Sequence, residues 1–552
     1  MQLTSIGRVI IGLLSIISSA CVSQAQPLSK SGSATRQDSL RGTLNAERTW
    51  WDVTRYDISV QPDYSAKTIK GSVVMGFRVT GTGSKMQIDL QEPMQLDKAL
   101  LNGQSLNFTR EGNHFHLSID VSLPQNSQQS ITLEFSGKPV EAVRPPWDGG
   151  WIWRKDKQGN PWMSVACQGL GASVWYPCKD HQSDEPDNGA SLAIIVPQDL
   201  VGVGNGRLIK TEPNDNGTTT YVWEVKNPIN NYNIIPYIGK YAHWSEVFNG
   251  EKGPLNCEYW VLEENLEAAK KQFQQTKPML QCFEHWFGPY PFYEDGFKLV
   301  ESPHLGMEHQ SAVAYGNKFQ NGYLGRDLSG TGWGLKWDFI LVHESGHEWF
   351  GNNITTKDIA DMWVHEGFTN YSETIFTQCQ SGLDAANDYL VGIRKNIAND
   401  IPVIGQYGVN KEGSGDMYYK ASNMIHIIRQ IIGDDEKFRL LLRGLNKDFY
   451  HSTTSSAEVE KYISNYAGKD LSKIFDQYLR TTQVPRLEYR FKKGKLFYRW
   501  QNVADGFNMP VKVKLDKNDT WLEPATQWKT LRTKATALTA DRNFYITTQA
   551  GN

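Results

Sequence analysis

The chain has 552 residues, of which 39% are hydrophobic and 21% are charged. This length exceeds the roughly 250 to 300 residues at which a single hydrophobic core usually stops growing, so several domains are expected. Lys and Arg number 57 against 60 Asp and Glu, and the net charge of -3 lacks the basic excess of a nucleic-acid-binding protein. Aromatic residues make up 12% of the chain, which excludes collagen-like, coiled-coil and wholly disordered classes.

Residues 1–25 have the pattern of a secretory signal peptide. Arg8 precedes a short apolar run, and Ser23 and Ala25 are the small residues expected before a cleavage site after Ala25. The segment ending at Cys21 loosely resembles a bacterial lipoprotein box, an alternative that would put a lipid anchor on Cys21. A buried N-terminal strand is the structural alternative. No later stretch is long and apolar enough to span a bilayer, so we expect a periplasmic or secreted protein.

Cysteines are sparse for a secreted chain. Six are present, and one of them lies in the signal peptide. The rest cannot pair completely because their number is odd, and no two have the C-x-x-C spacing of a zinc or redox site. We therefore expect disulfides to contribute little and each remaining cysteine to be a small buried thiol. The five are Cys167, Cys178, Cys257, Cys282 and Cys379.

Hydropathy patterns divide the rest of the chain into four parts. Residues 26–47 are rich in Ser, Thr, Gln and Gly, which predicts a flexible linker. Short alternating segments separated by turn residues predict an antiparallel β domain over residues 48–262. Helical periodicity predicts a mostly α domain over residues 263–484, and renewed alternation predicts a small β-sandwich over residues 485–552. The expected fold class is multidomain α+β.

The informative motif is His343-Glu344-x-x-His347. On a helix, His343 and His347 lie one turn apart on one face, so both imidazoles can reach a single metal ion. Glu366, which starts a second helical pattern, is the predicted third ligand. Two His and one carboxylate leave a fourth position open, which is typical of a catalytic zinc rather than a structural one. We expect one Zn²⁺ per chain, with Glu344 as the general base.

Two further residues lie close to the predicted ligands in the sequence. Glu373 lies two turns after Glu366 and is predicted to accept a hydrogen bond from a ligand His, which would fix its tautomer. The alternative for Glu373 is a solvated helix carboxylate. His365 faces another side of the helix and is not predicted to be a ligand.

The spacing of these residues resembles that of the gluzincin aminopeptidases, the group of aminopeptidase N and leukotriene hydrolase. With the signal-peptide pattern, the resemblance implies a secreted bacterial member of that family. The segment Leu305-Gly306-Met307-Glu308-His309 is similar to the family's G-x-M-E-N strand. The resemblance implies that Gly306, Met307 and Glu308 bind substrate, with the Glu308 carboxylate holding the substrate's free α-amine. Leu305 and His309 depart from the pattern. The resemblance also implies a thermolysin-like fold for the catalytic domain.

Two further residues follow from the resemblance. Tyr418-Tyr419-Lys420-Ala421 is similar to the family's Y-x-K-G motif, which implies that Tyr418 donates a hydrogen bond to the oxyanion of the tetrahedral intermediate. Tyr419 is the rival, because the doubled tyrosine leaves a one-residue ambiguity. In the β domain, Gln168 resembles the polar residue that helps to bind the amine; its alternative is a turn glutamine.

The sequence therefore predicts a zinc aminopeptidase acting on peptides with a free N-terminus. Three alternatives stay open: a zinc endopeptidase, a hydrolase of a lipid epoxide at the same site, and a catalytically inactive binding protein. A carboxylate at position 308 favours the exopeptidase, because it pairs with an ammonium and not with an internal amide. Retention of Glu344 and of all three predicted ligands argues against an inactive protein.

Overall fold

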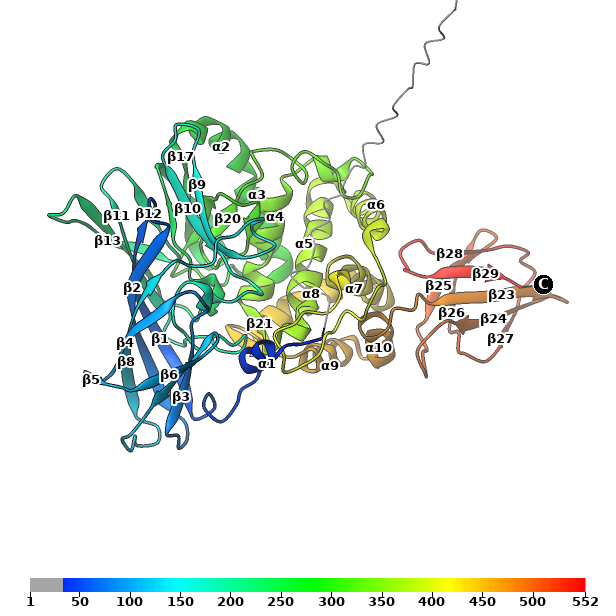
Figure 1. Ribbon diagram of the computed structural model, residues 1–552. Coiled ribbons are helices and arrows are strands. Elements are labelled where there is room, and N and C mark those ends of the chain that lie inside the picture. The colour runs from blue at the N-terminus through cyan, green and yellow to red at the C-terminus, as the bar shows by residue number, and fades with distance from the viewer. Residues whose placement is uncertain (1–32, 552) are drawn as a thin grey trace, which may run out of the picture.

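The computed structural model describes residues 33–551. It confirms the expected order of a β-rich domain, a helical domain and a C-terminal β module (Figure 1). The predicted signal peptide, with the alternative lipid site at Cys21, lies outside the described residues. Within residues 33–551, no helix has both the length and the apolar character needed to cross a membrane.

The N-terminal domain is built on an eight-stranded sheet in the order β13-β14-β11-β1-β2-β8-β4-β5. Alternate residues of these strands are buried, as the sequence pattern predicts. One pair departs from the antiparallel prediction, because β1 and β11 run parallel. The strands are β1 (Trp51–Asp63), β2 (Thr68–Val79), β4 (Gln95–Leu101), β5 (Gln104–Ser105), β8 (Gln128–Gly137), β11 (Ala190–Pro197), β13 (Arg207–Pro213) and β14 (Thr218–Val225).

Two smaller sheets complete this domain, in the orders β3-β7-β6 and β12-β15-β10-β9. They consist of β3 (Lys85–Asp89), β6 (Phe108–Glu111), β7 (His114–Ser118), β9 (Gly150–Lys155), β10 (Pro161–Ala166), β12 (Val201–Val203) and β15 (Tyr237–Gly239). Strand β10 ends two residues before Gln168, so the end of this sheet carries one of the predicted substrate-binding residues.

One hairpin that precedes the predicted domain boundary at residue 262 pairs with a strand that follows it. Strand β17 pairs in parallel with β18, and Tyr259 lies opposite Leu299. The β16-β17 hairpin therefore belongs to a five-stranded sheet, β16-β17-β18-β20-β19, that forms part of the helical domain. Its strands are β16 (Tyr241–Gly250), β17 (Gly253–Leu262), β18 (Phe297–Glu301), β19 (Gly306–Met307) and β20 (Val313–Tyr315).

Helices make up most of the second domain. The apolar helix α4 is buried along its whole length, and Asp338 caps its first turn through Leu341 N at 3.2 Å. Helix α5 ends at Gly382, whose φ of 90° suits glycine. The helices are α2 (Leu266–Gln272), α3 (Thr276–Phe287), α4 (Phe339–Gly346), α5 (Trp363–Ser381), α6 (Leu383–Ile393), α7 (Tyr419–Ile432), α8 (Asp435–Asp448), α9 (Ser456–Ala467) and α10 (Ser472–Arg480); β21 (Ile354–Thr356) and β22 (Ser452–Thr454) pair beside them.

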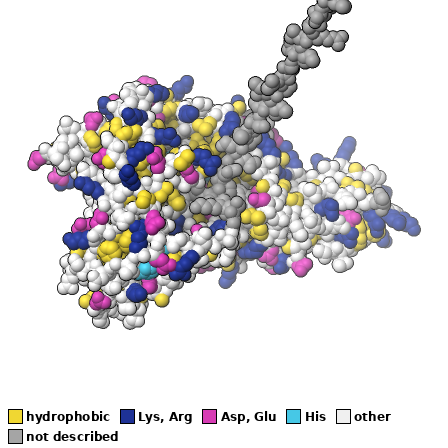
Figure 2. All heavy atoms as spheres, in the orientation of Figure 1, with side chains coloured by type: hydrophobic (Ala, Val, Ile, Leu, Met, Phe, Trp, Pro, Cys, Tyr) yellow, Lys and Arg dark blue, Asp and Glu magenta, His cyan; other side chains and the backbone are white. Residues whose placement is uncertain are grey.

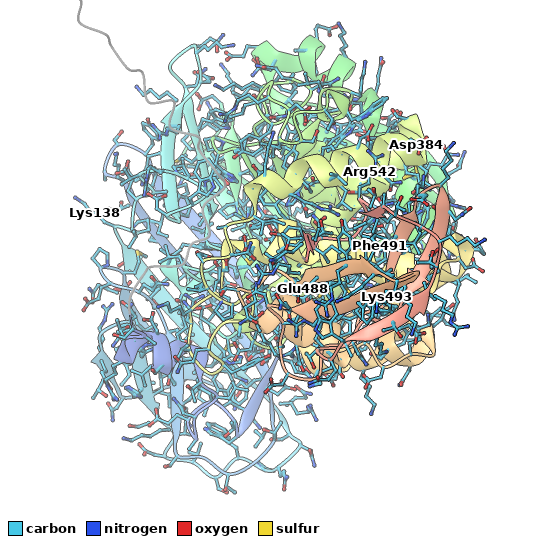
Figure 3. All side chains as sticks on the ribbon, turned by 90° about the vertical axis from the view of Figure 1, so that its right-hand side faces the viewer. Lys138, Asp384, Glu488, Phe491, Lys493 and Arg542 are labelled. Atoms are coloured by element: carbon cyan, nitrogen blue, oxygen red, sulfur yellow. A yellow bond between two sulfur atoms is a disulfide. The ribbon has the colours of Figure 1, made fainter. Side chains whose placement is uncertain are left out.

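The C-terminal module contains two sheets, in the orders β27-β24-β23-β29 and β26-β25-β28. It packs on the helical domain through Arg394, which donates to the backbone carbonyls of Arg542 and Asn543 at 2.5 and 3.1 Å. Figure 3 turns this module toward the viewer. The strands are β23 (Arg486–Lys492), β24 (Lys495–Gln501), β25 (Val511–Leu515), β26 (Asn518–Leu522), β27 (Lys529–Arg532), β28 (Leu538–Ala540) and β29 (Thr547–Ala550).

Charge is unevenly distributed over the molecule. Figure 2 shows Lys and Arg side chains gathered at the right-hand end, over the C-terminal module. Lys and Arg also outnumber Asp and Glu in the sequence of this module, although the whole chain carries a net charge of -3. The β and helical domains are therefore more acidic than the overall charge indicates.

The described part of the predicted linker, residues 33–47, contains regular structure. Residues 36–42 form a short helix, α1 (Arg36–Gly42), which begins with a capping box between Thr35 and Asp38. Its polar composition suggested a solvated tether, but the polar side chains bond to the two domains instead.

The expectation that every cysteine is a free thiol is wrong for two of them. Cys282 on α3 and Cys379 on α5 form a disulfide, whereas Cys167, Cys178 and Cys257 are free and buried as expected. The pair lies 97 residues apart in the sequence, so only the packing of α3 against α5 brings the two sulfur atoms together. The odd count left room for such a pair without indicating its members.

We predict that replacing both Cys282 and Cys379 by Ser lowers the free energy of unfolding by about 2 to 5 kcal/mol, because a bridge that closes a long loop restricts the unfolded chain. Denaturant unfolding of the oxidised wild type, the reduced wild type and the double variant checks this. The reduced wild type is the control and should unfold like the variant. Equal stability of the variant and the oxidised wild type would contradict the prediction.

Candidate active site

The three predicted zinc ligands converge between α4 and α5. The Nε2 atoms of His343 and His347 lie 3.6 and 3.4 Å from Oε2 of Glu366. All three side chains are buried, and one ligand atom from each lies within 4.8 Å of the others. Within the described residues, Nε2 of His347 and Oε2 of Glu366 have no hydrogen-bond partner. Two buried polar atoms facing each other in this way fit coordination of one zinc ion by the three side chains.

Hydrogen bonds fix the far side of each imidazole. Nδ1 of His343 bonds to Oε1 of Glu373 at 2.7 Å, and Nδ1 of His347 bonds to the carbonyl of Phe350 at 3.0 Å. Both bonds form when the proton is on Nδ1. Each Nε2 is then unprotonated, and its lone pair can bind a metal ion. Glu373 also accepts from Tyr389 at 2.6 Å, so it is not a solvated carboxylate.

Glu344 is buried beside this cluster and is not one of the three converging ligands. Burial raises the pKa of its carboxyl to about 7, against the opposing effect of the two imidazoles. Strand β19 lies directly against it: a Cβ atom at Gly306 would come within 2.6 Å of Oε1 of Glu344. This contact explains why position 306 is a glycine, since any side chain there would displace the predicted general base.

A second group of side chains surrounds Glu308, which follows β19. Oε1 of Glu308 accepts from Nε2 of Gln168 at 2.5 Å and from the hydroxyl of Tyr232 at 3.0 Å. The amide of Asn352 donates to the Glu308 backbone carbonyl at 2.7 Å, which anchors the segment. Burial raises the pKa of the Glu308 carboxyl, and His347 opposes this. The β domain thus contributes Gln168 and Tyr232 to a carboxylate of the helical domain.

The two groups adjoin each other. Ligand atoms of Glu308, Glu344 and His347 also lie within 4.8 Å of one another. The Glu308 carboxylate therefore lies beside the predicted general base and one predicted zinc ligand. This is the arrangement expected where a chain terminus is recognised next to the bond that is cleaved.

Comparison with known families agrees with this geometry. A model of the peptidase family M1 domain matches residues 271–478, and a model of the peptidase M1 N-terminal domain matches residues 53–232. The chain belongs to peptidase family M1. The gap between the two matches contains the β16-β17 hairpin, which the structure assigns to the sheet of the catalytic domain.

Curated relatives include a leukotriene hydrolase and two aminopeptidases. The chain is 20% identical over 473 residues to leukotriene A-4 hydrolase of Xenopus laevis, covering 80% of this chain and 73% of that protein. It is 21% identical to aminopeptidase N of Lactococcus lactis subsp. lactis and 24% identical to aminopeptidase B of Rattus norvegicus, covering 78% and 67% of this chain. The matches span about half of those two aminopeptidases, 51% and 53%.

Solved structures share the fold. The M1 zinc metallopeptidase of Deinococcus radiodurans superposes with a TM-score of 0.67 at 19% identity, over 80% of this chain and 95% of that one. A mutant of that enzyme bound to a Tyr-Ser-Ala substrate also gives a TM-score of 0.67, at 18% identity and with 80% and 96% covered. At such identities the likeness supports the fold assignment, while the roles of individual side chains rest on the geometry above.

Of the two neighbouring tyrosines in this M1 chain, Tyr418 lies against a predicted zinc ligand. Its ring stacks on His343 with the centroids 6.1 Å apart. Burial and the nearby Glu366 raise the pKa of Tyr418 well above its usual value, so its phenol remains a proton donor. The pKa of Tyr419 is also raised, by burial and by Glu373, which lies behind the ligands. Ala421, which departs from the motif, packs where Gly367 brings α5 close to α7.

We expect Tyr418→Phe to lower kcat by about 10² to 10³-fold with little change in KM, because the lost hydrogen bond would form mainly in the transition state. Tyr419→Phe is the matched control and should retain most of the activity. Steady-state kinetics on a peptide substrate decides between the neighbours: a large loss for Tyr419→Phe and none for Tyr418→Phe would reverse the assignment.

Sequence reasoning missed two members of the site. Tyr232 and Asn352 both hold Glu308, one through its carboxylate and the other through its backbone. Asn233, next to Tyr232, bonds to Asn352 at 2.8 Å, so these residues also join the two domains. The run Asn230-Asn231-Tyr232-Asn233 was a signal, since consecutive amides before a strand are costly to bury without partners.

Proposed function

We propose that this chain is a zinc aminopeptidase that removes N-terminal residues from peptides. The observation that carries the proposal is the buried Glu308 carboxylate, held by Gln168 and Tyr232 next to the zinc-fitting cluster. A buried carboxylate needs a cation to balance it, and the α-ammonium of a peptide supplies one beside the bond to be cleaved. An internal amide has no charge and cannot replace that pairing.

His343, His347 and Glu366 would hold the zinc. Bound zinc supplies Lewis-acid polarisation of the attacking water and the scissile carbonyl. Glu344 takes the proton from the water and passes it to the leaving amine. Tyr418 donates a hydrogen bond to the oxygen on which negative charge develops. Glu373 keeps the imidazole of His343 oriented throughout.

The alternatives differ in what they require of Glu308. An endopeptidase has no use for a carboxylate that pairs with a chain terminus, and an epoxide hydrolase substrate carries no ammonium. One relative is named leukotriene A-4 hydrolase, but the contacts around Glu308 favour an amine substrate. An inactive binding protein is disfavoured because Glu344 and the three predicted zinc ligands converge on one buried site, and Tyr418 stacks on His343.

We also propose that the protein acts in the periplasm or outside the cell. The signal-peptide pattern of residues 1–25 supports this location. The disulfide between Cys282 and Cys379 supports it independently, because disulfides persist mainly in oxidising compartments. Mass spectrometry of the exported protein distinguishes cleavage after Ala25 from lipidation at Cys21.

Metal removal tests the proposal. We expect dialysis against a chelator to abolish hydrolysis of a panel of aminoacyl arylamides, and added zinc to restore it at one ion per chain, measured by elemental analysis. The same panel identifies the preferred N-terminal residue. Full activity after the zinc has been removed would contradict the proposal.

A further inference from the structure

Helix α1 lies between the two domains that form the active site (Figure 1). On the catalytic side, the backbone carbonyl of Asp38 accepts from Asn410 N at 2.9 Å, and Thr43 Oγ1 donates to the carbonyl of Gly408 at 2.9 Å. On the β-domain side, Arg41 donates to the carbonyl of Gly169 at 2.7 Å. A segment before the first strand therefore bonds to both domains.

Arg41 holds the loop that carries Gln168. Besides Gly169, its guanidinium donates to the carbonyl of Leu170, and its Nε lies 3.2 Å from a carboxylate oxygen of Asp180. Gly169 and Leu170 directly follow Gln168, so one side chain holds the backbone next to the predicted amine-binding residue. The amide of Asn410 also donates to the Gly169 carbonyl, at 2.9 Å. Gln91, from the β domain, is a further donor to Leu170.

The backbone of Arg41 is itself fixed. Arg48 is completely buried and donates to the carbonyls of Leu40, Arg41 and Thr43 at 3.1, 2.7 and 3.3 Å. Its other Nη pairs with Asp89 at 3.0 Å within the β domain. The Arg41 side chain thus projects from a rigid support onto the loop after Gln168.

These contacts extend to the surroundings of Glu308, the residue predicted to bind the substrate's free amine. Arg41, Gly169 and Asn410 line a cavity together with Tyr232, whose hydroxyl bonds to Glu308. Gln168 and Tyr232 donate to the same oxygen of Glu308, so a shift of the Gln168 loop changes the shape of the amine site. Such a site tolerates little displacement, because a charge-assisted hydrogen bond depends strongly on distance and angle.

We propose that Arg41 is a positioning residue, which sets Gln168 against Glu308 and so determines the affinity for the substrate's free amine. This inference rests on the proposed aminopeptidase function. It assigns to the segment before the first β-strand a role in substrate binding rather than a role as a tether. Arg41 acts through Gln168 and does not touch the substrate.

The test is a set of variants assayed on free-amine aminoacyl arylamides. Arg41→Gln, Gln168→Ala and the double variant are compared with the wild type, and Arg36→Gln is the matched control. Arg36 lies on the same helix but is exposed and pairs with Glu111, away from the loop. Asn410→Ala removes a second bond to the Gly169 carbonyl and serves if Arg41→Gln fails to fold.

We expect Arg41→Gln to raise KM about tenfold, the equivalent of one hydrogen bond to a charged group, with kcat within about twofold of the wild type. Because Arg41 acts through Gln168, adding Arg41→Gln to Gln168→Ala should raise KM no further. Asn410→Ala should shift KM in the same direction, and Arg36→Gln should leave it unchanged.

Two results would overturn the inference and leave the proposed function intact. The first is that Arg41→Gln raises KM by the same factor with and without Gln168. The second is that Arg41→Gln lowers the melting temperature and kcat and leaves KM unchanged. The second would show that Arg41 only joins the domains. Wild-type activity in the same assay reports on the proposed function. If the wild type cleaves no free-amine substrate, the proposed function fails and the inference fails with it.

Discussion

Replacing Glu344 by Gln is expected to lower kcat by about 10² to 10⁴-fold, the usual contribution of a positioned general base. Glutamine has nearly the same shape but cannot accept the proton of the attacking water. Glu344 is not one of the three converging ligands, so the variant should still bind zinc. The contact with Gly306 leaves no room for a larger replacement, which makes Gln the appropriate substitution.

Single-turnover kinetics measures the rate of the chemical step, and elemental analysis of the same sample measures its zinc content. Full zinc content with a lost chemical step is the expected result. A variant that keeps more than about a tenth of the wild-type kcat would show that another group accepts the proton. Loss of zinc with loss of activity would instead indicate that Glu344 helps to hold the metal.

The second large effect concerns substrate choice. Glu308→Gln is expected to lower kcat/KM for free-amine substrates by about 10² to 10³-fold, because an ammonium loses its buried charge partner. Hydrolysis of N-acetylated counterparts, which we expect to be slow in the wild type, should change little. The ratio between the two substrate classes therefore falls, and this change in ratio separates the amine-binding role from a general loss of activity.

Glu301→Gln is the matched control for this variant. Glu301 is a buried carboxyl seven residues upstream, and its oxygens accept from Leu262 N and from Asn265 at 2.8 and 2.7 Å, outside the amine site. It should leave the substrate ratio unchanged even if stability falls. An unchanged ratio in Glu308→Gln, or an equal change in both variants, would remove Glu308 from amine recognition.

Much of the fold followed from local pattern. Alternating residues in strands such as β1 and the apolar run of α4 are dictated by burial within each element, so periodicity alone indicates them. Alternation did not indicate which sheet the β16-β17 hairpin joins, because its strands would alternate in the same way in either sheet. Its pairing with β18 depends on residues far along the chain.

The polar helix α1 was missed for a different reason. Its stability comes from bonds to other segments, such as those from Arg48 to the carbonyls of Leu40 and Arg41, and not from an apolar face. Composition therefore gave no helical signal. The disulfide was missed in the same way, since Cys282 and Cys379 become neighbours only after α3 packs on α5.

Site residues differed in how local their signals were. His343, Glu344 and His347 lie within five consecutive residues, and their spacing alone indicated a metal site. Tyr232 and Asn352 lie on separate segments of the two domains and meet only at Glu308. No spacing rule connects them, so the structure was needed to find them.

The most direct test of the central claim is the ratio of kcat/KM for aminoacyl arylamides to that for their N-acetylated counterparts, measured with the zinc-loaded wild type. The account predicts a preference of about 10³-fold or more for the free amine, because acetylation removes the charge that Glu308 pairs with. Equal cleavage of both substrate classes would contradict it and would favour an endopeptidase.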